Sequence, residues 1–235
     1  MIAFVRRELK RYAGAQKKKR LQSFFKTGPG EYGEGDVFIG VTVPECRKTA
    51  LTCAEMSRND IEALLYSKVH EERLVALLIL VERFKQGSAS EKKSIFDFYL
   101  KHACRVNNWD LVDLTADKIV GAFLLDRSKS PLYRLARSSY LWERRISIVA
   151  TLHFIRAGHF EDTLELVEKL MGDTQDLLHK ACGWMLREVG KRDAAVLEQF
   201  LKKHCLSMPR TMLRYSIERL STAKKKMYLC GNVKP

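Results

Sequence analysis

Four apolar segments of the chain begin in a similar way, with His70-Glu-Glu-Arg73, Trp109-Asp-Leu-Val112, Leu141-Trp-Glu-Arg-Arg145 and His179-Lys-Ala-Cys182. With His70, Trp109, Trp142 and His179 as markers, the spacings are 39, 33 and 37 residues, in the range of paired-helix repeats. Stacked helix pairs bury a continuous core and leave a concave face built from one helix of each pair. The sequence therefore predicts an all-α superhelix, or solenoid. Because the repeats are degenerate, an irregular all-α bundle is the alternative.

Helical periodicity runs through the chain, and strand signals are nearly absent. A first helix is expected over residues 3–25, and residues 26–43 connect it to the next one through the Gly-rich loop Thr27–Asp36. That loop lacks the GK[ST] ending of a phosphate-binding loop. Pro44 suits the first turn of the following helix. Further helices are expected at roughly 58–67, 70–86, 90–106, 109–125, 131–138, 140–157, 160–171, 174–190, 193–205 and 208–221, in a single domain over residues 1–235.

Composition excludes several classes of protein. Of the 235 residues, 46% are hydrophobic and 30% are charged, which excludes disordered, collagen-like and low-complexity chains. The longest apolar run, Leu74–Val81, is far shorter than the roughly 20 residues that cross a bilayer, so no membrane partner is expected. Arg6, Arg7 and Lys10 stand where a signal peptide needs apolar residues, which predicts a cytoplasmic protein. Six cysteines without a CxxC motif predict reduced thiols and no structural zinc.

The formal net charge is +14, and the excess of positive charge lies at the two ends of the chain. Residues 1–26 hold nine basic side chains and one acidic one, and residues 210–235 hold seven and one. Residues 222–235 are expected to form a basic tail. Nucleic acid is the expected partner, bound in a concave groove with a basic lining, because each neutralised phosphate releases condensed counterions. For the run Lys17–Arg20 alone, a solvated helix face is the alternative.

A tryptophan and a carboxylate share one helix face near the middle of the chain. Asn108 is a good N-cap, which makes Trp109 the first helical residue and places Asp110 in the first turn, where a carboxylate complements the helix dipole. Asp113 follows Trp109 by four residues, so the two side chains lie about 40° apart around the helix. An apolar stripe beside Asp113 predicts that its carboxylate is partly buried. Trp109 and Asp113 can therefore act as one site.

Two further side chains join this set by their positions in the repeats. Arg145 follows Trp142 by three residues on nearly the same helix face, and Trp184 lies within the segment Lys180–Glu188. Taken singly, each tryptophan is explained as a core residue, and Arg145 as a member of a surface ion pair. Taken together, these residues indicate a site on the concave face.

The sequence resembles the AlkD-type DNA glycosylases, which are built of HEAT-like helical repeats and remove alkylated purines. The resemblance covers most of the chain. It is carried by Phe38-Ile-Gly-Val-Thr-Val-Pro-Glu-Cys-Arg47, Asn108-Trp-Asp-Leu-Val-Asp113, Leu141-Trp-Glu-Arg-Arg-Ile146 and Lys180-Ala-Cys-Gly-Trp-Met-Leu-Arg-Glu-Val189. The second and fourth segments agree with the family in spacing, chemistry and order. The Gly-rich loop departs from it, so N-terminal contacts to DNA are not carried over.

The resemblance implies that Asp113 is the catalytic carboxylate, that Trp109 and Trp184 flank the sugar-phosphate of the lesion, and that Arg145 holds the DNA backbone beside it. The adjacent Arg144 leaves the arginine assignment open by one position. The implied substrate is duplex DNA with purines alkylated at N3 or N7, handled without a deep base pocket, a cofactor or a metal, and we expect a monomer. No lysine occurs between Trp109 and Asp113, so hydrolysis without lyase activity is expected.

Two other functions compete with this one. A non-catalytic HEAT-like scaffold would bind nucleic acid or protein through the same face without releasing a base. A metal-dependent hydrolase would use His153, His159 or His179, but the sequence has no HExxH motif and no clustered carboxylates to support it.

Overall fold

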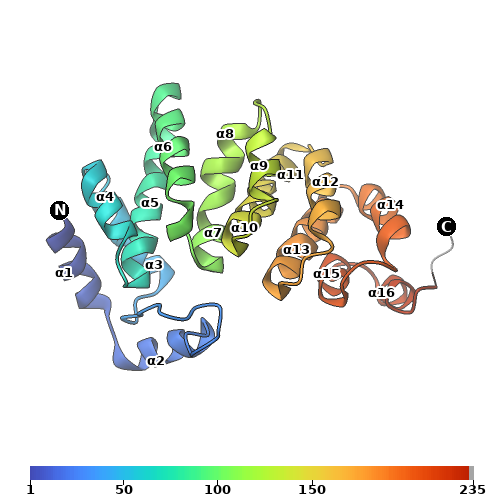
Figure 1. Cartoon of the computed structure of the whole chain (residues 1–235), viewed down its shortest axis with the longest axis horizontal. Helices are drawn as coiled ribbons and strands as arrows, with labels where there is room; N and C mark the ends of the chain where they lie inside the picture. Colours follow the sequence, from blue (N-terminus) through green and yellow to red (C-terminus); the bar gives the residue numbers. More distant parts are fainter. Residues whose placement is uncertain (233–235) are drawn as a thin grey trace. The chain divides into compact units, whose positions relative to one another are not determined.

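The computed structural model describes residues 1–232 and is 70% helical, with no strand among the residues described. Figure 1 shows the succession of short helices along the chain. The predicted all-α fold of helical repeats is confirmed, and none of the described helices combines the length and apolar character that crossing a membrane requires. The chain divides into two compact units, Met1–Thr115 and the residues from Ala116 onward. The concave groove stays a prediction.

The first unit is organised around one long buried helix, α5. Its residues Leu74–Val81 are buried on every side, because α3 and α4 both pack against it and α6 follows it (Figure 1). An apolar run of this length buried all round forms the centre of a helical core. The elements of this unit are α1 (Ile2–Tyr12), α2 (Ala15–Phe24), α3 (Val43–Thr52), α4 (Arg58–Leu65), α5 (His70–Gln86), α6 (Ala89–Lys101), the 3₁₀ turn η1 (Ala103–Arg105) and α7 (Trp109–Ala116), whose last residue lies in the second unit.

The predicted single helix over residues 3–25 is wrong. The chain leaves the helix at Ala13 and Gly14, which have extended backbone angles, and α2 begins at Ala15. The reason is a close approach of two backbones: a Cβ on Gly40 would lie 2.4 Å from the carbonyl oxygen of Gly14. Gly40 also has a φ of +89°, so only glycine fits there without strain. The break in the helix therefore makes room for the segment that follows the Gly-rich loop.

The Gly-rich loop is a series of turns, as predicted, and it ends on the core. Val37 forms an isolated parallel bridge with Val69, in which the His70 N–H donates to the Val37 carbonyl over 2.9 Å. Thr42 and Glu45 then form a capping box that starts α3, with Pro44 in its first turn as expected. The connection is therefore fixed at both of its ends.

The second unit is centred on α13, which packs against the helices before and after it. The helices that contact it are α10, α11, α12, α14 and α15. A Cβ on Gly183 of α13 would lie 2.5 Å from the Met212 carbonyl oxygen, so glycine allows α15 to approach this closely. The elements are the π-helical turn η2 (Asp117–Gly121), α8 (Ala122–Leu124), α9 (Ser130–Leu135), α10 (Leu141–Ala150), α11 (Leu152–Ala157), α12 (Glu161–Leu170), α13 (Asp176–Arg192), α14 (Ala194–His204), α15 (Arg210–Ser216) and α16 (Thr222–Leu229).

The last of these helices lies where a basic tail was expected. In the predicted tail, residues 222–235, Thr222–Leu229 form α16, capped by the Ser221 hydroxyl, and Tyr228 is buried. The guanidinium of Arg210 donates to the Leu229 carbonyl over 2.9 Å and ties α16 to α15. Residues 233–235 of the predicted tail lie outside the described part of the chain.

Candidate active site

The start of α7 is held by side chains on both sides of Trp109. The Asn108 side-chain oxygen accepts a hydrogen bond from the Trp109 N–H over 2.8 Å, so the helix begins at Trp109 as predicted. Asp110 is buried, and its carboxylate accepts from the Leu111 N–H over 2.8 Å. The same carboxylate also accepts from Nε2 of His70 over 2.9 Å. Asp110 therefore has a tertiary partner in addition to the predicted role in the first turn.

The Trp109 indole is half-buried and packs against the end of α2. Its ring stacks on Phe25 with centroids 4.9 Å apart and an interplanar angle of 13°, and Phe24 meets it edge-on at 5.6 Å. The indole N–H donates to the Tyr32 hydroxyl in the Gly-rich loop over 3.3 Å. The α2 helix and the loop thus set the orientation of this tryptophan.

Asp113 lies one helical turn after Trp109 on α7. Its side chain is half-buried, while the neighbouring Val112 and Ala116 are fully buried. The prediction that this carboxylate lies at the edge of the core is confirmed. A side chain in such a position can still contact a ligand that covers the helix.

In the second unit, the two adjacent arginines have different surroundings. Arg144 forms an ion pair with Asp173 at 2.7 Å and donates to the Ser138 carbonyl over 2.8 Å. Arg145 is 5% exposed, and its guanidinium donates to the carbonyl of Leu177 at the start of α13. Asp173 thus balances the charge of Arg144. The assignment of the DNA contact to Arg145 rather than to Arg144 stays a prediction.

Trp184 is half-buried on α13, and its indole N–H donates to Glu188 over 3.2 Å. Burial raises the pKa of Glu188, but its ion pairs with Lys191 and Arg187 outweigh that effect and hold this pKa below its ordinary value. Glu188 therefore stays ionised and fixes the edge of the indole. Trp142, the other tryptophan of this unit, is 5% exposed and belongs to the core.

The predicted site residues thus form two groups. Trp109 and Asp113 lie one turn apart on α7 in the first unit. Arg145 on α10 contacts the first turn of α13, the helix that carries Trp184, in the second unit. The assembly of the two groups into one site stays a prediction.

Sequence reasoning missed a buried polar network next to Trp109. Nδ1 of His70 lies 3.3 Å from the Asp36 carboxylate, and Asp36 also binds the Arg73 guanidinium at 2.6 Å. Burial lowers the pKa of His70, but Asp110 and Asp36 outweigh it and raise this pKa to about 9. The available signal was the polar motif at the head of an apolar helix, which we used only as a repeat marker.

A further buried carboxylate, that of Glu71, binds the segment that follows the loop. Glu71 is 1% exposed and accepts hydrogen bonds from the backbone N–H groups of Ile39, Gly40 and Val41 at 3.0, 2.9 and 3.2 Å. These residues lie in one of the segments that carry the family resemblance. That segment therefore has a structural role in the first unit.

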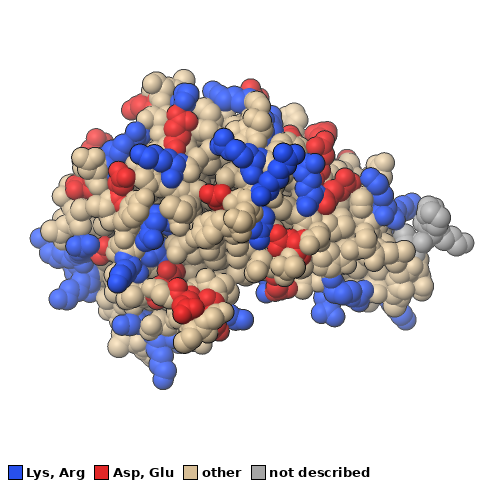
Figure 2. All heavy atoms as spheres, in the orientation of Figure 1, with Lys and Arg blue, Asp and Glu red and all other residues tan. Residues whose placement is uncertain are grey.

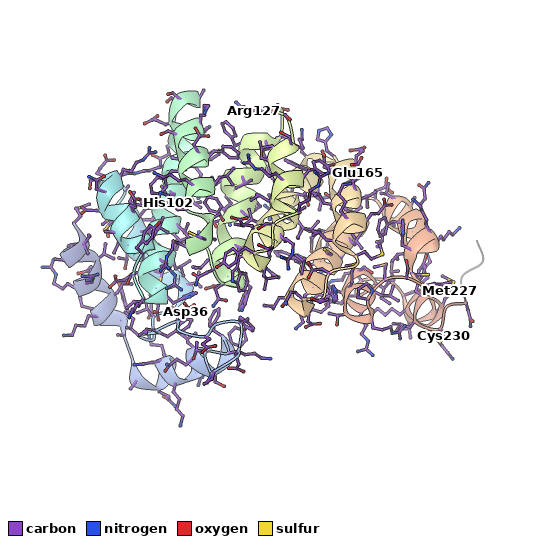
Figure 3. All side chains as sticks on the ribbon, in the orientation of Figure 1. Asp36, His102, Arg127, Glu165, Met227 and Cys230 are labelled. Carbon is purple, nitrogen blue, oxygen red and sulfur yellow. The ribbon has the colours of Figure 1, made fainter. Side chains whose placement is uncertain are left out.

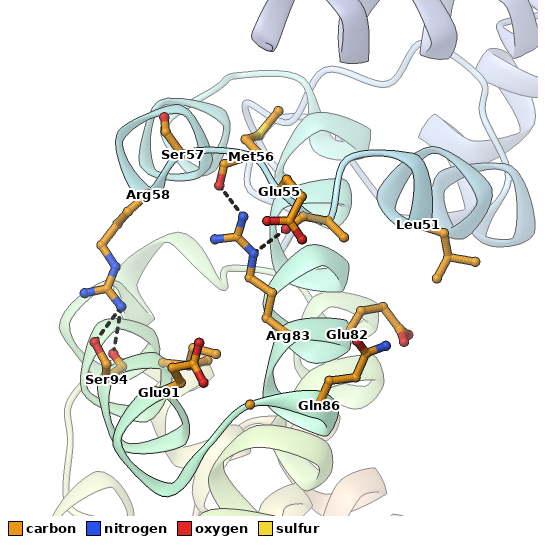
Figure 4. A pocket seen from close by; sticks show the side chains of 13 residues that line it. Leu51, Glu55, Met56, Ser57, Arg58, Glu82, Arg83, Gln86, Glu91 and Ser94 are labelled. Atoms are coloured by element: carbon orange, nitrogen blue, oxygen red, sulfur yellow. Dashed lines mark hydrogen bonds between the residues drawn. The ribbon is translucent and has the colours of Figure 1, made fainter.

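A cavity of about 590 Å³ lies elsewhere in the first unit, between the α3–α4 connection, the end of α5 and α6 (Figure 4). Its arginines are bound to the protein itself. Arg83 donates to the carbonyls of Ala54 and Met56, and Arg58 donates to the Ser94 hydroxyl over 2.8 Å. None of the predicted site residues lines this cavity.

A metal-dependent hydrolase gains no support from the described residues. Over residues 1–232, no three His, Cys, Asp or Glu side chains are grouped so that they would hold a metal ion. Of the three histidines considered for such a role, His179 contacts the backbone carbonyl of Asp173 through Nε2 at 2.5 Å.

Comparison with known proteins agrees with the family that the sequence suggested. Residues 5–220 match the family described as DNA alkylation repair enzyme. A search of curated proteins finds no significant match. Among solved structures, the chain is similar to a predicted DNA alkylation repair enzyme from Enterococcus faecalis, with 17% identity and a TM-score of 0.68 over 89% of this chain and 97% of the other.

Two further structures from Streptococcus mutans share the fold. AlkD2 is 17% identical, with a TM-score of 0.56 over 88% of this chain and 99% of its own. The protein smu.31 from strain UA159 is 18% identical, with a TM-score of 0.52 over 94% of this chain and 98% of its own. At these identities the three structures show the fold alone.

Proposed function

Since the chain belongs to the family of DNA alkylation repair enzymes, we propose that it is a monofunctional DNA glycosylase that hydrolyses the N-glycosidic bond of N3- or N7-alkylated purines in duplex DNA. The observation that carries the proposal is the half-buried Asp113, one turn after Trp109 on a helix whose first turn is fixed by Asn108 and Asp110. We further propose that the protein acts as a monomer in the cytoplasm, without a cofactor or a metal.

The substrate determines what the site has to supply. A purine alkylated at N3 or N7 carries a positive charge, so the base can leave without being protonated first. The sugar then develops oxocarbenium character, as in glycoside hydrolysis. An ionised Asp113 beside the anomeric carbon would stabilise that charge and could orient or deprotonate the attacking water.

The other predicted site residues would bind the lesion and the DNA backbone. The indoles of Trp109 and Trp184 would attract a cationic sugar or nucleoside, each by roughly 0.5 to 2 kcal/mol. Stacking on Phe25 holds the Trp109 indole in one orientation and covers one of its faces, so this attraction would use the opposite face. Arg145 would pair with a phosphate and fix the register of the DNA.

The distribution of charge supports a duplex as the partner. Lys18, Lys19 and Arg20 are exposed on α2, the helix that packs against Trp109. Figure 2 shows Lys and Arg side chains over the part of the surface formed by the N-terminal helices. Such basic side chains bind the DNA backbone irrespective of sequence.

The test uses duplex oligonucleotides with a single 7-methylguanine or 3-methyladenine, assayed for free base and for intact abasic sites. Wild-type protein is expected to release the base and leave the DNA strand uncut. Asp113→Asn should lower the single-turnover rate at least about 100-fold, the usual effect of removing a charge that stabilises the transition state, with DNA affinity nearly unchanged. Asp97→Asn is the matched control, because Asp97 is an exposed carboxylate whose partner is Lys93 on the same helix.

Full activity of Asp113→Asn would remove Asp113 from the mechanism. DNA binding by the wild-type protein without release of any methylated base would favour the alternative, a non-catalytic scaffold that binds nucleic acid or protein. The basic side chains at both ends of the chain would serve such a scaffold equally well.

A further inference from the structure

The first turn of α5 is buried although all four of its residues are polar. His70, Glu71, Glu72 and Arg73 are 1%, 1%, 5% and 1% exposed, and the apolar run Leu74–Val81 follows them directly. Burying four such groups is costly unless each has a partner. Glu71 binds the backbone after the Gly-rich loop, and Glu72 binds the Arg6 guanidinium at 2.9 Å. The remaining two residues, His70 and Arg73, are part of the buried polar network next to Trp109.

His70 lies between two carboxylates from distant parts of the chain. Its Nε2 is 2.9 Å from Asp110 on α7, and its Nδ1 is 3.3 Å from Asp36. Asp36 ends the Gly-rich loop and is labelled in Figure 3. The imidazole ring stacks on Phe38 with centroids 4.4 Å apart. A neutral imidazole has one donor nitrogen, so His70 donates to both carboxylates at once only when the ring is an imidazolium.

The same network reaches Trp109 from two directions. The Asn108 amide group donates to Asp36 over 3.2 Å, so both residues that flank Trp109 are connected to His70, one through Asp36 and one directly. The centroid of the Phe25 ring lies 5.2 Å from that of the His70 ring, and Phe25 also stacks on Trp109. The position of the indole therefore depends on the network as well as on α7.

We propose that His70 is a positioning residue for the reaction proposed above: as an imidazolium bound by Asp36 and Asp110, it fixes the first turn of α7 and thereby the Trp109 indole and the Asp113 carboxylate. The proposal rests on the proposed function and extends it to a residue that does not touch the substrate. It also gives the Gly-rich loop a role, because that loop supplies Asp36.

The charges around His70 explain why its proton matters. Asp36 faces it from the loop, Asp110 from α7 and Arg73 from α5, with Nη2 of Arg73 3.5 Å from Nδ1 of His70. The Cys46 thiol faces the cluster from α3. Its burial, and then the carboxylates Glu71 and Asp110, raise its pKa well above the ordinary value, so the thiol stays neutral. The Arg73 guanidinium balances the charge of Asp36, and the His70 imidazolium balances that of Asp110.

Loss of the proton would therefore loosen the start of α7. The pKa of His70, raised to about 9 by Asp110 and Asp36 against the effect of burial, keeps the ring charged at neutral pH. Above that pH one nitrogen presents a lone pair to a carboxylate, and the hydrogen bond to it is lost. Small displacements of catalytic groups lower rates strongly, because reaction requires close alignment.

The first experiment compares single-turnover base release from pH 6.5 to 10, corrected for spontaneous release, in wild-type protein, His70→Gln and His102→Gln. His102 is the matched control, a buried histidine at the C-terminal end of α6, labelled in Figure 3. The wild-type rate should fall as the pH rises past about 9. His70→Gln should release the base about 10- to 100-fold more slowly than wild-type protein at pH 7.5, and its DNA affinity should stay within about threefold of the wild-type value. Its rate should not fall as the pH rises past about 9. His102→Gln should keep the wild-type profile.

A wild-type rate and pH profile in His70→Gln would overturn the proposal. So would equal losses in the two histidine variants, because a purely structural role predicts them. If His70→Gln does not fold, the second experiment decides, because its main measurement, the pH titration of Trp109 fluorescence, is made with His70 in place.

The second experiment does not depend on activity. The chain has three tryptophans, so Trp142→Phe/Trp184→Phe leaves Trp109 as the sole indole. Its fluorescence should change with a midpoint near pH 9, and adding His70→Gln should remove the change. A flat titration in the double variant would overturn the positioning role. If the titration is as expected but wild-type protein releases no base, the proposed function is contradicted and the link between His70 and Trp109 stays supported.

Discussion

Replacing His70 with Gln should remove a large part of the decrease in the free energy of unfolding that wild-type protein shows between about pH 6.5 and pH 9. The folded pKa of His70 is about 9, against 6.5 for an unperturbed histidine. A group whose pKa is raised on folding contributes stability that is fully present below its unfolded pKa and declines as the pH rises toward its folded pKa. The difference in pKa corresponds to about 3 kcal/mol. The contribution should therefore disappear between about pH 6.5 and pH 9.

The measurement is urea unfolding at pH 6.5 and 9.5, for wild-type protein, His70→Gln and His102→Gln. Between these two conditions, wild-type protein should lose about 3 kcal/mol more than His70→Gln does. Lysines, tyrosines and thiols that titrate in the same range contribute to both proteins and cancel in the comparison. Burial lowers the pKa of His102, so its own contribution has the opposite sign and falls below this range of pH. Identical pH dependence in wild-type protein and His70→Gln would refute the reasoning.

Three further predictions concern other parts of the molecule. Gly40→Ala should lower the free energy of unfolding by about 3 kcal/mol in thermal unfolding, because Gly40 has a φ of +89° and the new Cβ would clash with the Gly14 carbonyl. Gly30→Ala is the control: Gly30 also has a positive φ but has open space around it, so the loss should be about 1 kcal/mol. Glu71→Gln should cost about 2 kcal/mol in urea unfolding, since a charged acceptor of three backbone N–H groups is replaced by a neutral one; an unchanged midpoint would contradict this. Base release should be the same with and without EDTA, and a loss restored by a divalent metal would revive the metal-dependent alternative.

The parts of the fold that could be predicted are those fixed within one helix. The bounds of α5, His70–Gln86, agree with the predicted range 70–86, because the apolar run and its ends are local signals. The start of α7 at Trp109 follows from Asn108 for the same reason. By contrast, the break at Gly14 depends on contact with Gly40, and local periodicity carries no information about that contact.

The same distinction applies to the candidate site. Helix geometry relates Trp109 to Asp113, since both lie on α7. The ion pair of Arg144 with Asp173 joins residues 29 positions apart, and the partners of His70 lie 34 and 40 residues away in the chain. These pairings depend on how helices pack, so a single sequence does not specify them.

The α2 helix contributes no buried side chain to the protein, although Phe25, directly after it, covers the Trp109 ring. A segment with so few buried contacts opens locally at a small fraction of the free energy of global unfolding. In hydrogen–deuterium exchange, the amides of Ala15–Phe24 should therefore exchange well before those of α5. Each such opening would uncover the tryptophan while the helix beneath it stays folded, and a polyanion lying on the exposed lysines of α2 would slow this exchange by holding the helix closed.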